Sequence, residues 1–385
     1  MTGEHASTLD TPHAVNGRLR IGFMGEDHWA RHLAEGLNAR FPDSVECRHV
    51  TSYANPKAVW DTARLLHRSD LVVRVGFPPT VLPPAPTLDP ARSVSVRDRL
   101  KQGLFSTGPG RVVRACVLTC RFGPVWRRRA AMDRLERRSR RTGRRRTTVY
   151  YWIGSDVLLW LDDDAAGADT AARVRRLRGA SITGALHLSD ELRTLGIDSE
   201  TVPFPGAVIP APEPVPEMPA KMTVVSYVPA GRPDFYGLPE LLEAATHLPD
   251  VRFRVFGGAS DAGGGPAPDN VEYLGRVDDL CPVYADSSVV ARLVRHDAVG
   301  ATVTEGLLYA RPVLYSLPLP HTIHVPFGDS SRLVSALQAL RRDHMRSGIN
   351  PNVAGREWAR VEFDVERRFS RLRDFLVSSG GAGAD

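Results

Sequence analysis

The feature that most constrains the fold is an alternation of short apolar runs with segments of helical spacing, which appears in both halves of the chain. In the first half the apolar runs are residues 18–24, 71–77, 147–153 and 179–183. In the second half they are residues 222–227, 251–256, 270–274, 289–293 and 312–315. Strands that alternate with helices usually form a parallel sheet with helices on both faces. The pattern therefore predicts two doubly wound α/β domains.

A proline-rich segment separates the two halves. Residues 203–219 contain seven prolines, and proline at this density favours an extended, semi-rigid chain. We predict a first domain over 18–208, a linker over 209–220 and a second domain over 221–350. The spacing of apolar residues from Trp358 to Phe375 predicts a C-terminal helix within 351–377. Residues 1–17 and 378–385 are expected to be a disordered leader and tail.

The positive charge of the chain is concentrated in one stretch. The net charge is +6, and Arg127–Arg146 contains eleven arginines against Asp133 and Glu136, which leaves −3 for the rest of the chain. Three interpretations stay open: a solvated helix face, a surface that binds an anionic membrane, or a site for RNA or another polyanion. Aromatic residues are absent from the stretch. Nucleic acid is therefore the least favoured of these partners.

The composition indicates where the protein is located and whether it binds a metal. No apolar run is long enough to span a membrane, and the first residues have no apolar signal region. We expect a cytoplasmic protein, either free or peripheral at the inner face of the membrane. The cysteines, Cys47, Cys116, Cys120 and Cys281, are expected to be reduced thiols. They have no second pair or histidine cluster to complete a zinc site, so we predict no metal.

An acid–glycine–acid pattern follows the apolar run at 289–293. Gly300 stands three residues after Asp297, and seven residues separate Asp297 from Glu305. A carboxylate accepts hydrogen bonds from neighbouring hydroxyls, and the N–H groups of a glycine turn and a helix N-terminus attract a diphosphate. The alternative is that both acids are helix N-terminal residues favoured by the helix dipole.

This pattern, together with Pro312 and Val313, resembles the donor-site signature of retaining nucleotide-sugar glycosyltransferases of the GT-B fold, family 4 type. The resemblance implies two Rossmann-like domains facing across a cleft, with the C-terminal helix crossing back to the first domain. It implies that Asp297 contacts the sugar and that Glu305 holds the ribose. The chain departs from the family in having Asp rather than Glu at position 297, which shortens the acidic side chain by one methylene.

The resemblance extends to a glycine–arginine loop after the first strand of the second domain. Arg232 matches the family's diphosphate-binding arginine, but Tyr236 stands where the family has a lysine. The missing charge is expected from Arg295, with Arg292 as the second candidate. The remaining residues assigned to the donor are Gly25, Gly257, Gly275, Arg276, Val277, His296 and Ala301.

In the first domain, two strand ends are expected to meet the acceptor. One is Gly25-Glu26-Asp27, and the other is Trp152 to Asp156, where Trp152 would stack on a sugar and Ser155 would donate to it. We assign catalysis to Asp297, Glu305, Arg232 and Asp156. The alternatives are a plain tight turn at Gly25 and a helix cap at Asp156.

The resemblance implies a glycosyltransferase that moves a sugar from a UDP- or GDP-type donor to a hydroxyl, with retention and without metal or cofactor. The acceptor is a glycan, a lipid-linked sugar or a small molecule. Two alternatives stay open. One is an epimerase or inverting transferase of the same fold, and the other is a non-catalytic protein that binds a nucleotide sugar or a polyanion.

Overall fold

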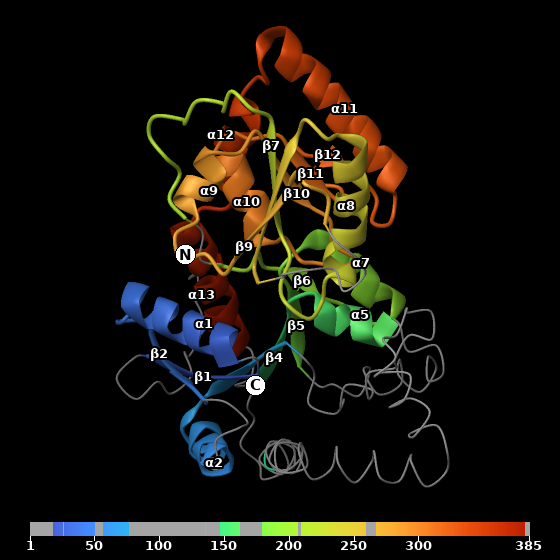
Figure 1. Cartoon of the computed structure of the whole chain (residues 1–385). Helices are drawn as coiled ribbons and strands as arrows, with labels where there is room; N and C mark the ends of the chain where they lie inside the picture. The colour runs from blue at the N-terminus through green and yellow to red at the C-terminus, as the bar shows by residue number, and fades with distance from the viewer. Residues whose placement is uncertain are drawn as a thin grey trace, which may run out of the picture. The chain divides into compact units, whose positions relative to one another are not determined.

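The computed structural model describes residues 18–25, 27–50, 57–76, 147–161, 179–206, 209–258 and 267–381, and also Leu135. The chain divides into two compact units, of which one comprises Met1–Pro203 with Phe369–Asp385 and the other Phe204–Arg368 (Figure 1). Each unit contains one six-stranded sheet in which every pair of neighbouring strands is parallel. The predicted pair of α/β domains is confirmed.

The first unit has the strand order β2-β1-β3-β4-β5-β6. Its strands are β1 (Leu19–Gly25), β2 (Val45–His49), β3 (Leu71–Val75), β4 (Thr147–Trp152), β5 (Ala180–Thr183) and β6 (Glu200–Thr201). The described helices that join them are α1 (Asp27–Arg40), α2 (Ala58–Arg68), α5 (Ser155–Leu161) and α7 (Leu186–Thr194). The central strands β1, β3 and β4 are almost wholly buried, which explains their continuous apolar sequences.

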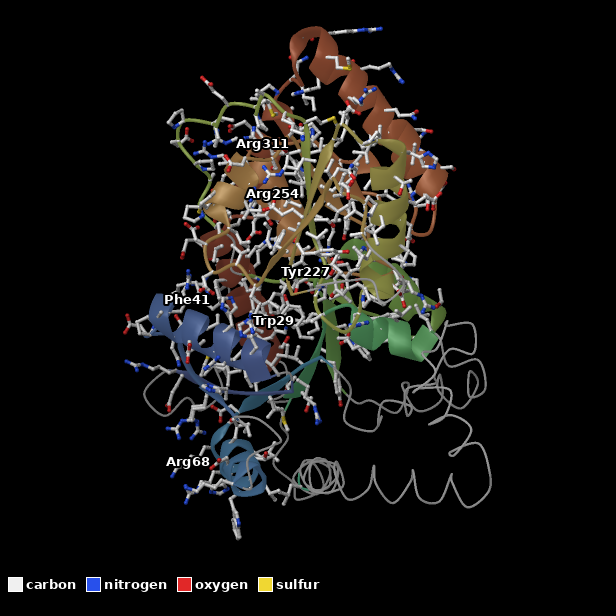
Figure 2. All side chains as sticks on the ribbon, viewed as in Figure 1. Trp29, Phe41, Arg68, Tyr227, Arg254 and Arg311 are labelled. Carbon is white, nitrogen blue, oxygen red and sulfur yellow. The ribbon has the colours of Figure 1, made fainter. Side chains whose placement is uncertain are left out.

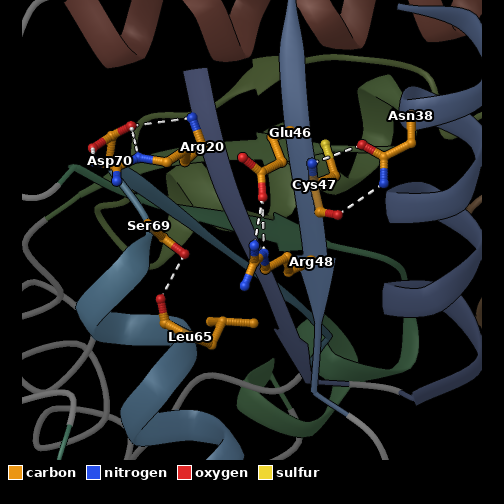
Figure 3. Close-up of polar contacts among 8 residues, drawn as sticks. All are labelled: Arg20, Asn38, Glu46, Cys47, Arg48, Leu65, Ser69 and Asp70. Carbon is orange, nitrogen blue, oxygen red and sulfur yellow. Dashed lines mark hydrogen bonds and ion pairs between the residues drawn. The ribbon is translucent and has the colours of Figure 1, made fainter. Parts of the chain in front are cut away.

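Side-chain hydrogen bonds fasten the edge of this sheet (Figure 3). The Asn38 amide donates to the Cys47 carbonyl at 2.8 Å, and its oxygen accepts from the Cys47 N–H at 2.7 Å. Asn38 thereby satisfies backbone groups of β2, the strand at the edge of the sheet. The Arg20 guanidinium on β1 donates twice to the carboxylate of Asp70, just before β3. Burial, with a smaller contribution from Glu46, raises the pKa of the Cys47 thiol to about 12, so this thiol is unreactive.

The second unit has the strand order β12-β11-β10-β7-β8-β9. Its strands are β7 (Thr223–Tyr227), β8 (Arg252–Phe256), β9 (Val271–Gly275), β10 (Val289–Arg292), β11 (Val313–Tyr315) and β12 (Ile323–His324). Its helices are η2 (Asp234–Tyr236), α8 (Leu238–His247), α9 (Cys281–Ala285), α10 (Ala301–Leu308), α11 (Ser330–Ser347) and α12 (Val353–Glu362). One core lies between the sheet and α8 and α11, and the other lies between the sheet and α9, α10 and α12.

The proline-rich segment is fastened to the second unit by buried arginines. Arg311, which is fully buried, donates to the carbonyls of Pro216 and Glu217 at 3.0 and 3.1 Å, and also to Ala285 at 2.8 Å. Arg356 donates to the Pro212 carbonyl at 2.6 Å. Figure 2 shows Arg311 at one end of this sheet and Tyr227, where β7 finishes, at the other. The segment is therefore held against this unit.

The C-terminal segment differs from the single helix that the spacing predicts. It forms α12 and then α13 (Val365–Gly381), because the Asp364 carboxylate accepts the Arg367 N–H at 2.6 Å and starts a new helix. From Phe369 onward the chain packs with the first unit. The Phe369 ring lies against Gly36 of α1, and the Arg40 guanidinium lies 4.4 Å from its centroid. The predicted return of this segment to the first domain is confirmed.

Candidate functional site

A row of side chains crosses the carboxyl ends of three neighbouring strands in the second unit. Arg292, the last residue of β10, is in register with Tyr315, the last residue of β11. The pairing of Ala291 with Ser226 places Tyr227, the last residue of β7, on the other side of Arg292. The Arg292 guanidinium carbon lies 5.4 Å from the Tyr227 ring centroid. Parallel α/β sheets bind ligands at this edge, so the row is the starting point for a site.

Asp297 holds the guanidinium in place. Nε and Nη2 of Arg292 donate to the same carboxylate oxygen at 3.0 and 2.7 Å. Burial lowers the pKa of Arg292, but Asp297 and the tyrosines oppose this effect and the net pKa is raised, so the group stays charged. A Cβ at Gly300 would lie 2.7 Å from Asp297 Oδ2 and 2.9 Å from Arg292 Nε. Glycine at this position therefore leaves room for the pair.

The glycine–arginine loop lies over this pair. The Tyr236 ring centroid lies 4.7 Å from the Arg292 guanidinium carbon and 5.7 Å from the Tyr227 centroid. Arg232 is exposed and stacks at 3.9 Å on the ring of Phe235. Gly237 has a φ of 63°, and a Cβ there would overlap Leu293 at the end of β10. This close approach brings the loop to the strand end, as glycine alone permits without strain.

The sequence favours Arg295 over Arg292 as the source of the diphosphate-binding charge that the family's lysine would supply. Arg292 contacts the Tyr236 ring, whereas Arg295 is exposed and its backbone N–H donates to the Phe235 carbonyl at 3.0 Å. Arg295 ranks first in the sequence because it lies nearer the strand end, and which of the two arginines binds the diphosphate stays a prediction.

The Tyr315 hydroxyl, a polar atom in the row, has no hydrogen-bond partner in the part of the chain that the structure describes. The Tyr315 side chain is 1% exposed. Its pKa is raised well above the usual value by burial and by Asp297, against the effect of Arg292. Burial likewise raises the pKa of Tyr227, with a contribution from Tyr236. A buried polar group without a protein partner marks a place for water or a ligand.

Glu305 lies one turn into α10 and is held by protein donors. Its side chain is 5% exposed, and Oε2 accepts from the Tyr284 hydroxyl at 2.7 Å. Burial raises the pKa of Glu305, while hydrogen bonds from Tyr284 and from the Ile209 backbone oppose the rise. Tyr284 was not singled out from the sequence. The carboxylate that the resemblance assigns to the ribose is thus in contact with α9 and the segment at Ile209.

The other expected donor residues lie at neighbouring strand ends. Gly257 follows β8, its N–H donates to the Gly275 carbonyl at 2.8 Å, and a Cβ there would lie 2.6 Å from the Tyr227 ring. Arg276 is close enough to lower the pKa of Tyr227. Val277 packs against the core cluster that includes α9, and His296 is buried. Gly300 is the N-cap residue of α10, which begins at Ala301.

In the first unit, Asp156 faces inward. It is 2% exposed, and its carboxylate accepts the N–H groups of Ile153, Gly154 and Val157 at 2.8 to 3.2 Å. Burial raises its pKa to about 6 in spite of these bonds. The contacts are those of a carboxylate that fixes the Gly154 turn and the start of α5, which is the helix-cap alternative.

Trp152 differs from its expected role. Its ring is 1% exposed and belongs to the core of the first unit, so neither ring face is open for stacking on a sugar. Gly25 is the last residue of β1, and a Cβ there would lie 2.0 Å from the Val75 carbonyl oxygen of the neighbouring strand. Glu26 and the side chains of Asp27 and Ser155 lie outside the described residues.

The described residues contain neither a metal-binding cluster nor a helix that could span a membrane. They hold no group of three histidine, cysteine, aspartate or glutamate side chains that would bind a metal ion. Within the same ranges no helix is both long and apolar enough to cross a membrane. The arginine-rich stretch Arg127–Arg146 lies outside the described residues except for Leu135.

Comparison with known proteins identifies the architecture. No protein-family model matches the chain, and neither does any curated protein. HepE of Anabaena, solved in complex with UDP and glucose, superposes with a TM-score of 0.57 at 13% identity, covering 94% of this chain and 100% of that one. Sucrose-phosphate synthase from Thermosynechococcus elongatus gives 0.55 at 15% identity, with the same coverage. The chain has the GT-B fold. A glycosyltransferase from Rickettsia africae, at 0.53 and 10% identity over 94% and 98% of the two chains, agrees.

These superpositions extend over nearly the whole chain rather than over one motif. They confirm the predicted GT-B fold. The row Tyr227–Arg292–Tyr315 lies at the carboxyl edge of the second GT-B sheet. Assignment to family 4 stays a prediction, since identities of 10 to 15% establish the fold alone.

Proposed function

We propose that the protein is a glycosyltransferase that moves a sugar from a nucleotide-diphosphate donor to a hydroxyl acceptor. The observation that carries the proposal is the buried, charged Arg292 at the carboxyl edge of the second sheet, next to the N-terminus of α10. The GT-B fold supports it, and HepE, which shares that fold, was solved with UDP and glucose. A guanidinium and helix N–H groups suit a diphosphate.

The donor would lie across the strand ends. Arg232 and Arg292 would bind the diphosphate with the first N–H groups of α10, and the base would meet the loop at Gly275 to Val277. Asp297 neutralises Arg292 at 2.7 Å. When the diphosphate binds, Arg292 would exchange part of this pairing for phosphate oxygens, and Asp297 would become available to the sugar hydroxyls.

Glu305 would bind the ribose, as the family resemblance implies. Its hydrogen bond from Tyr284, at 2.7 Å, orients the carboxylate. Ribose hydroxyls would have to replace this donor or the Ile209 N–H, and the free energy of that exchange reduces the net gain from binding. Asp156 would act as a positioning residue for the first unit's Gly154 turn rather than as a catalytic residue.

The transfer itself needs little from the protein beyond charge and position. The bond between the anomeric carbon and the phosphate oxygen breaks, the acceptor oxygen bonds to that carbon, and the acceptor proton goes to the departing phosphate. Arg232 and Arg292 would stabilise the negative charge on the leaving diphosphate, so the reaction would proceed without metal. If the acceptor enters on the face that the phosphate leaves, the anomeric configuration is retained.

Binding and product analysis test the proposal. UDP, GDP and their sugars should raise the thermal unfolding midpoint of the wild type, since a ligand of the folded state stabilises it. Arg292→Gln should abolish this shift and lower kcat/KM by about 10²–10³-fold, as expected when a diphosphate ligand is lost. Arg341→Gln, which breaks a surface pair with Asp250, is the control. A normal shift in Arg292→Gln would refute the assigned role.

The stereochemistry and the metal requirement need separate measurements. Proton NMR of the product should show the donor's anomeric configuration, and turnover should persist in EDTA. Inversion would favour an inverting transferase, and recovery of an isomerised sugar nucleotide without acceptor would favour an epimerase. Binding of donor with neither transfer nor slow hydrolysis would favour the non-catalytic alternative.

A further inference from the structure

The hydroxyl of Tyr315 is not explained by the packing of the second unit. The ring belongs to the core on the α9, α10 and α12 side of the sheet, where Val294 and Val303 are also buried. The side chain is 1% exposed, and its oxygen has no hydrogen-bond partner among the described residues. A phenylalanine would fill the same space without burying an unpaired polar atom, which costs free energy. A tyrosine at this position therefore indicates a hydrogen bond that forms when a ligand is bound.

Tyr151 in the first unit shows the usual arrangement of a buried tyrosine. It is also 1% exposed, and its hydroxyl donates to the Val202 carbonyl at 2.7 Å. Tyr284 is likewise buried, and its hydroxyl donates to the Glu305 carboxylate at 2.7 Å. Tyr315 differs from these two tyrosines because its hydroxyl hydrogen is not used by the fold. Removal of the Tyr315 hydroxyl should therefore not lower the stability of the protein.

The pair of Arg292 and Asp297 lies within electrostatic reach of this hydroxyl. Tyr315 is in register with Arg292 across β11 and β10, so the two side chains lie on the same face of the sheet at its carboxyl edge. Burial and then Asp297 raise the pKa of Tyr315, and Arg292 opposes the rise. A hydroxyl donates its strongest hydrogen bonds to an anion. The Asp297 carboxylate is therefore the acceptor that suits Tyr315 best.

Arg292 cannot bind Asp297 and a diphosphate with the same N–H groups. Its Nε and Nη2 both donate to one carboxylate oxygen, at 3.0 and 2.7 Å. A guanidinium binds phosphate best through two such neighbouring N–H groups. If a phosphate takes them, the Asp297 carboxylate, whose side chain is 17% exposed, loses both donors. A carboxylate so little exposed then needs another donor.

We propose that Tyr315 is a positioning residue that donates its hydroxyl hydrogen to the Asp297 carboxylate when Arg292 binds the donor's diphosphate. The role rests on the proposed function, because it requires that Arg292 turn to phosphate. The hydrogen bond would keep the carboxylate charged and fix its orientation, so that it accepts from a sugar hydroxyl. Direct contact between the Tyr315 hydroxyl and phosphate fits less well, because the oxygen is closed to solvent.

Nucleotide titrations of the full chain with Tyr315→Phe test the proposal. UDP and GDP are titrated by calorimetry, and the nucleoside of whichever diphosphate binds the wild type, uridine or guanosine, is titrated by NMR. The affinity for the diphosphate should fall about tenfold, as expected for the loss of a hydrogen bond to a charged group. The affinity for the nucleoside, which offers Arg292 no phosphate, should be unchanged. The urea midpoint without nucleotide should equal or exceed that of the wild type.

Two further variants separate positioning from general effects on the structure. Tyr151→Phe, the matched control, removes a hydroxyl that has a partner, so it should lower the urea midpoint and leave the diphosphate affinity unchanged. Asp297→Ala removes the proposed acceptor. In that background Tyr315→Phe should lower the diphosphate affinity by less than about twofold, because the effects of interacting residues do not add. Thermal unfolding verifies that each variant is folded, and if Asp297→Ala is not, the comparison of diphosphate with nucleoside in Tyr315→Phe decides.

Three outcomes would overturn the role of Tyr315 alone. The first is wild-type diphosphate affinity in Tyr315→Phe while Arg292→Gln abolishes binding. The second is an equal loss of affinity for the diphosphate and the nucleoside, which would mean a purely structural role. The third is a loss of about tenfold that persists in the Asp297→Ala background, which would mean direct contact with the ligand. Binding of neither UDP nor GDP to the wild type would instead contradict the proposed function, and the role of Tyr315 with it.

Discussion

Gly300 determines how closely Arg292 and Asp297 can pair. Any side chain at this position would meet both partners, at 2.7 Å from the carboxylate and 2.9 Å from the guanidinium. The pair lies at the edge of a sheet where Tyr227, Tyr236 and Tyr315 surround the guanidinium. A buried charge in such a position is stable only while its counter-ion and hydrogen bonds stay in place.

We predict that Gly300→Ala separates the pair and weakens donor binding. The new methyl group would move the Asp297 carboxylate, and the thermal shift caused by UDP or GDP should fall by half or more. The control is Gly206→Ala, where the nearest atom to the added carbon is 3.9 Å away. A donor-induced shift of wild-type size in Gly300→Ala would mean that the pair has no part in donor binding.

The raised pKa of Asp156 predicts that the free energy of unfolding depends on pH. Its pKa is about 6 in the fold against a usual value of 3.8, because burial disfavours the charged form. Between these two values the folded state holds more protons than the unfolded state. The free energy of unfolding should therefore fall as pH rises from about 4 to 6, by on the order of 3 kcal/mol, and then level off.

Urea titrations of wild type and Asp156→Asn between pH 4 and 7 measure this contribution, which should be absent from the variant. Asp250→Asn is a control of opposite sign, since Arg341 lowers the pKa of the exposed Asp250. A wild-type slope that persists in Asp156→Asn would assign the pH dependence to Glu240 or Glu305, whose pKa values burial also raises.

Part of the site was predictable from the sequence because it lies near strand ends. Arg232, Asp297 and Gly300 follow β7 and β10 directly, and parallel strands bring their carboxyl ends to one edge. The partners of Arg292 were not predictable in the same way. They depend on the register of β10 with β7 and β11, which joins residues far apart in the chain. The burial of Trp152 and Asp156 depends on packing around β4, which no local pattern reports.

At the scale of elements, Arg311 joins three of them. It connects the proline-rich segment, the end of α9 and the start of β11 through its five contacts, which include Met218 Sδ and the Tyr284 carbonyl. Burial lowers its pKa to about 10, which still leaves it charged at neutral pH. Composition predicted an extended, semi-rigid linker here, but proline content does not show which side chains donate hydrogen bonds to its carbonyl groups.

We predict that Arg311→Met destabilises the second unit by about 3–5 kcal/mol, since it leaves several buried carbonyl groups without donors. Arg311→Lys should lose less, because an ammonium group still reaches some of these acceptors. Urea unfolding measures both. Arg360→Gln, which removes an exposed contact with Glu213, should cost about 0–1 kcal/mol and is the control. Equal losses of unfolding free energy in Arg311→Met and Arg360→Gln would contradict the role of Arg311 in holding the proline-rich segment.

At the scale of the whole molecule, the chain completes its first unit with its last residues. Sequence spacing predicted a C-terminal helix and the family resemblance predicted its return, but neither indicated the break at Asp364. The return depends on Phe369, whose ring lies against Gly36 and within 4.4 Å of the Arg40 guanidinium carbon. Phe369 thus packs against α1 of the first unit, far from it in the sequence.

Phe369→Ala should therefore destabilise the first unit selectively, by about 3–5 kcal/mol, because it empties a buried site beside α1. Hydrogen exchange should speed up in the amides of β1 and α1, while those of β7 and β10 keep their protection. Val377→Ala, at a side chain 44% exposed on the same helix, is the control and should change neither set. Equal loss of protection in both sheets would mean that the two units unfold as one, and that the packing of Phe369 stabilises the entire chain.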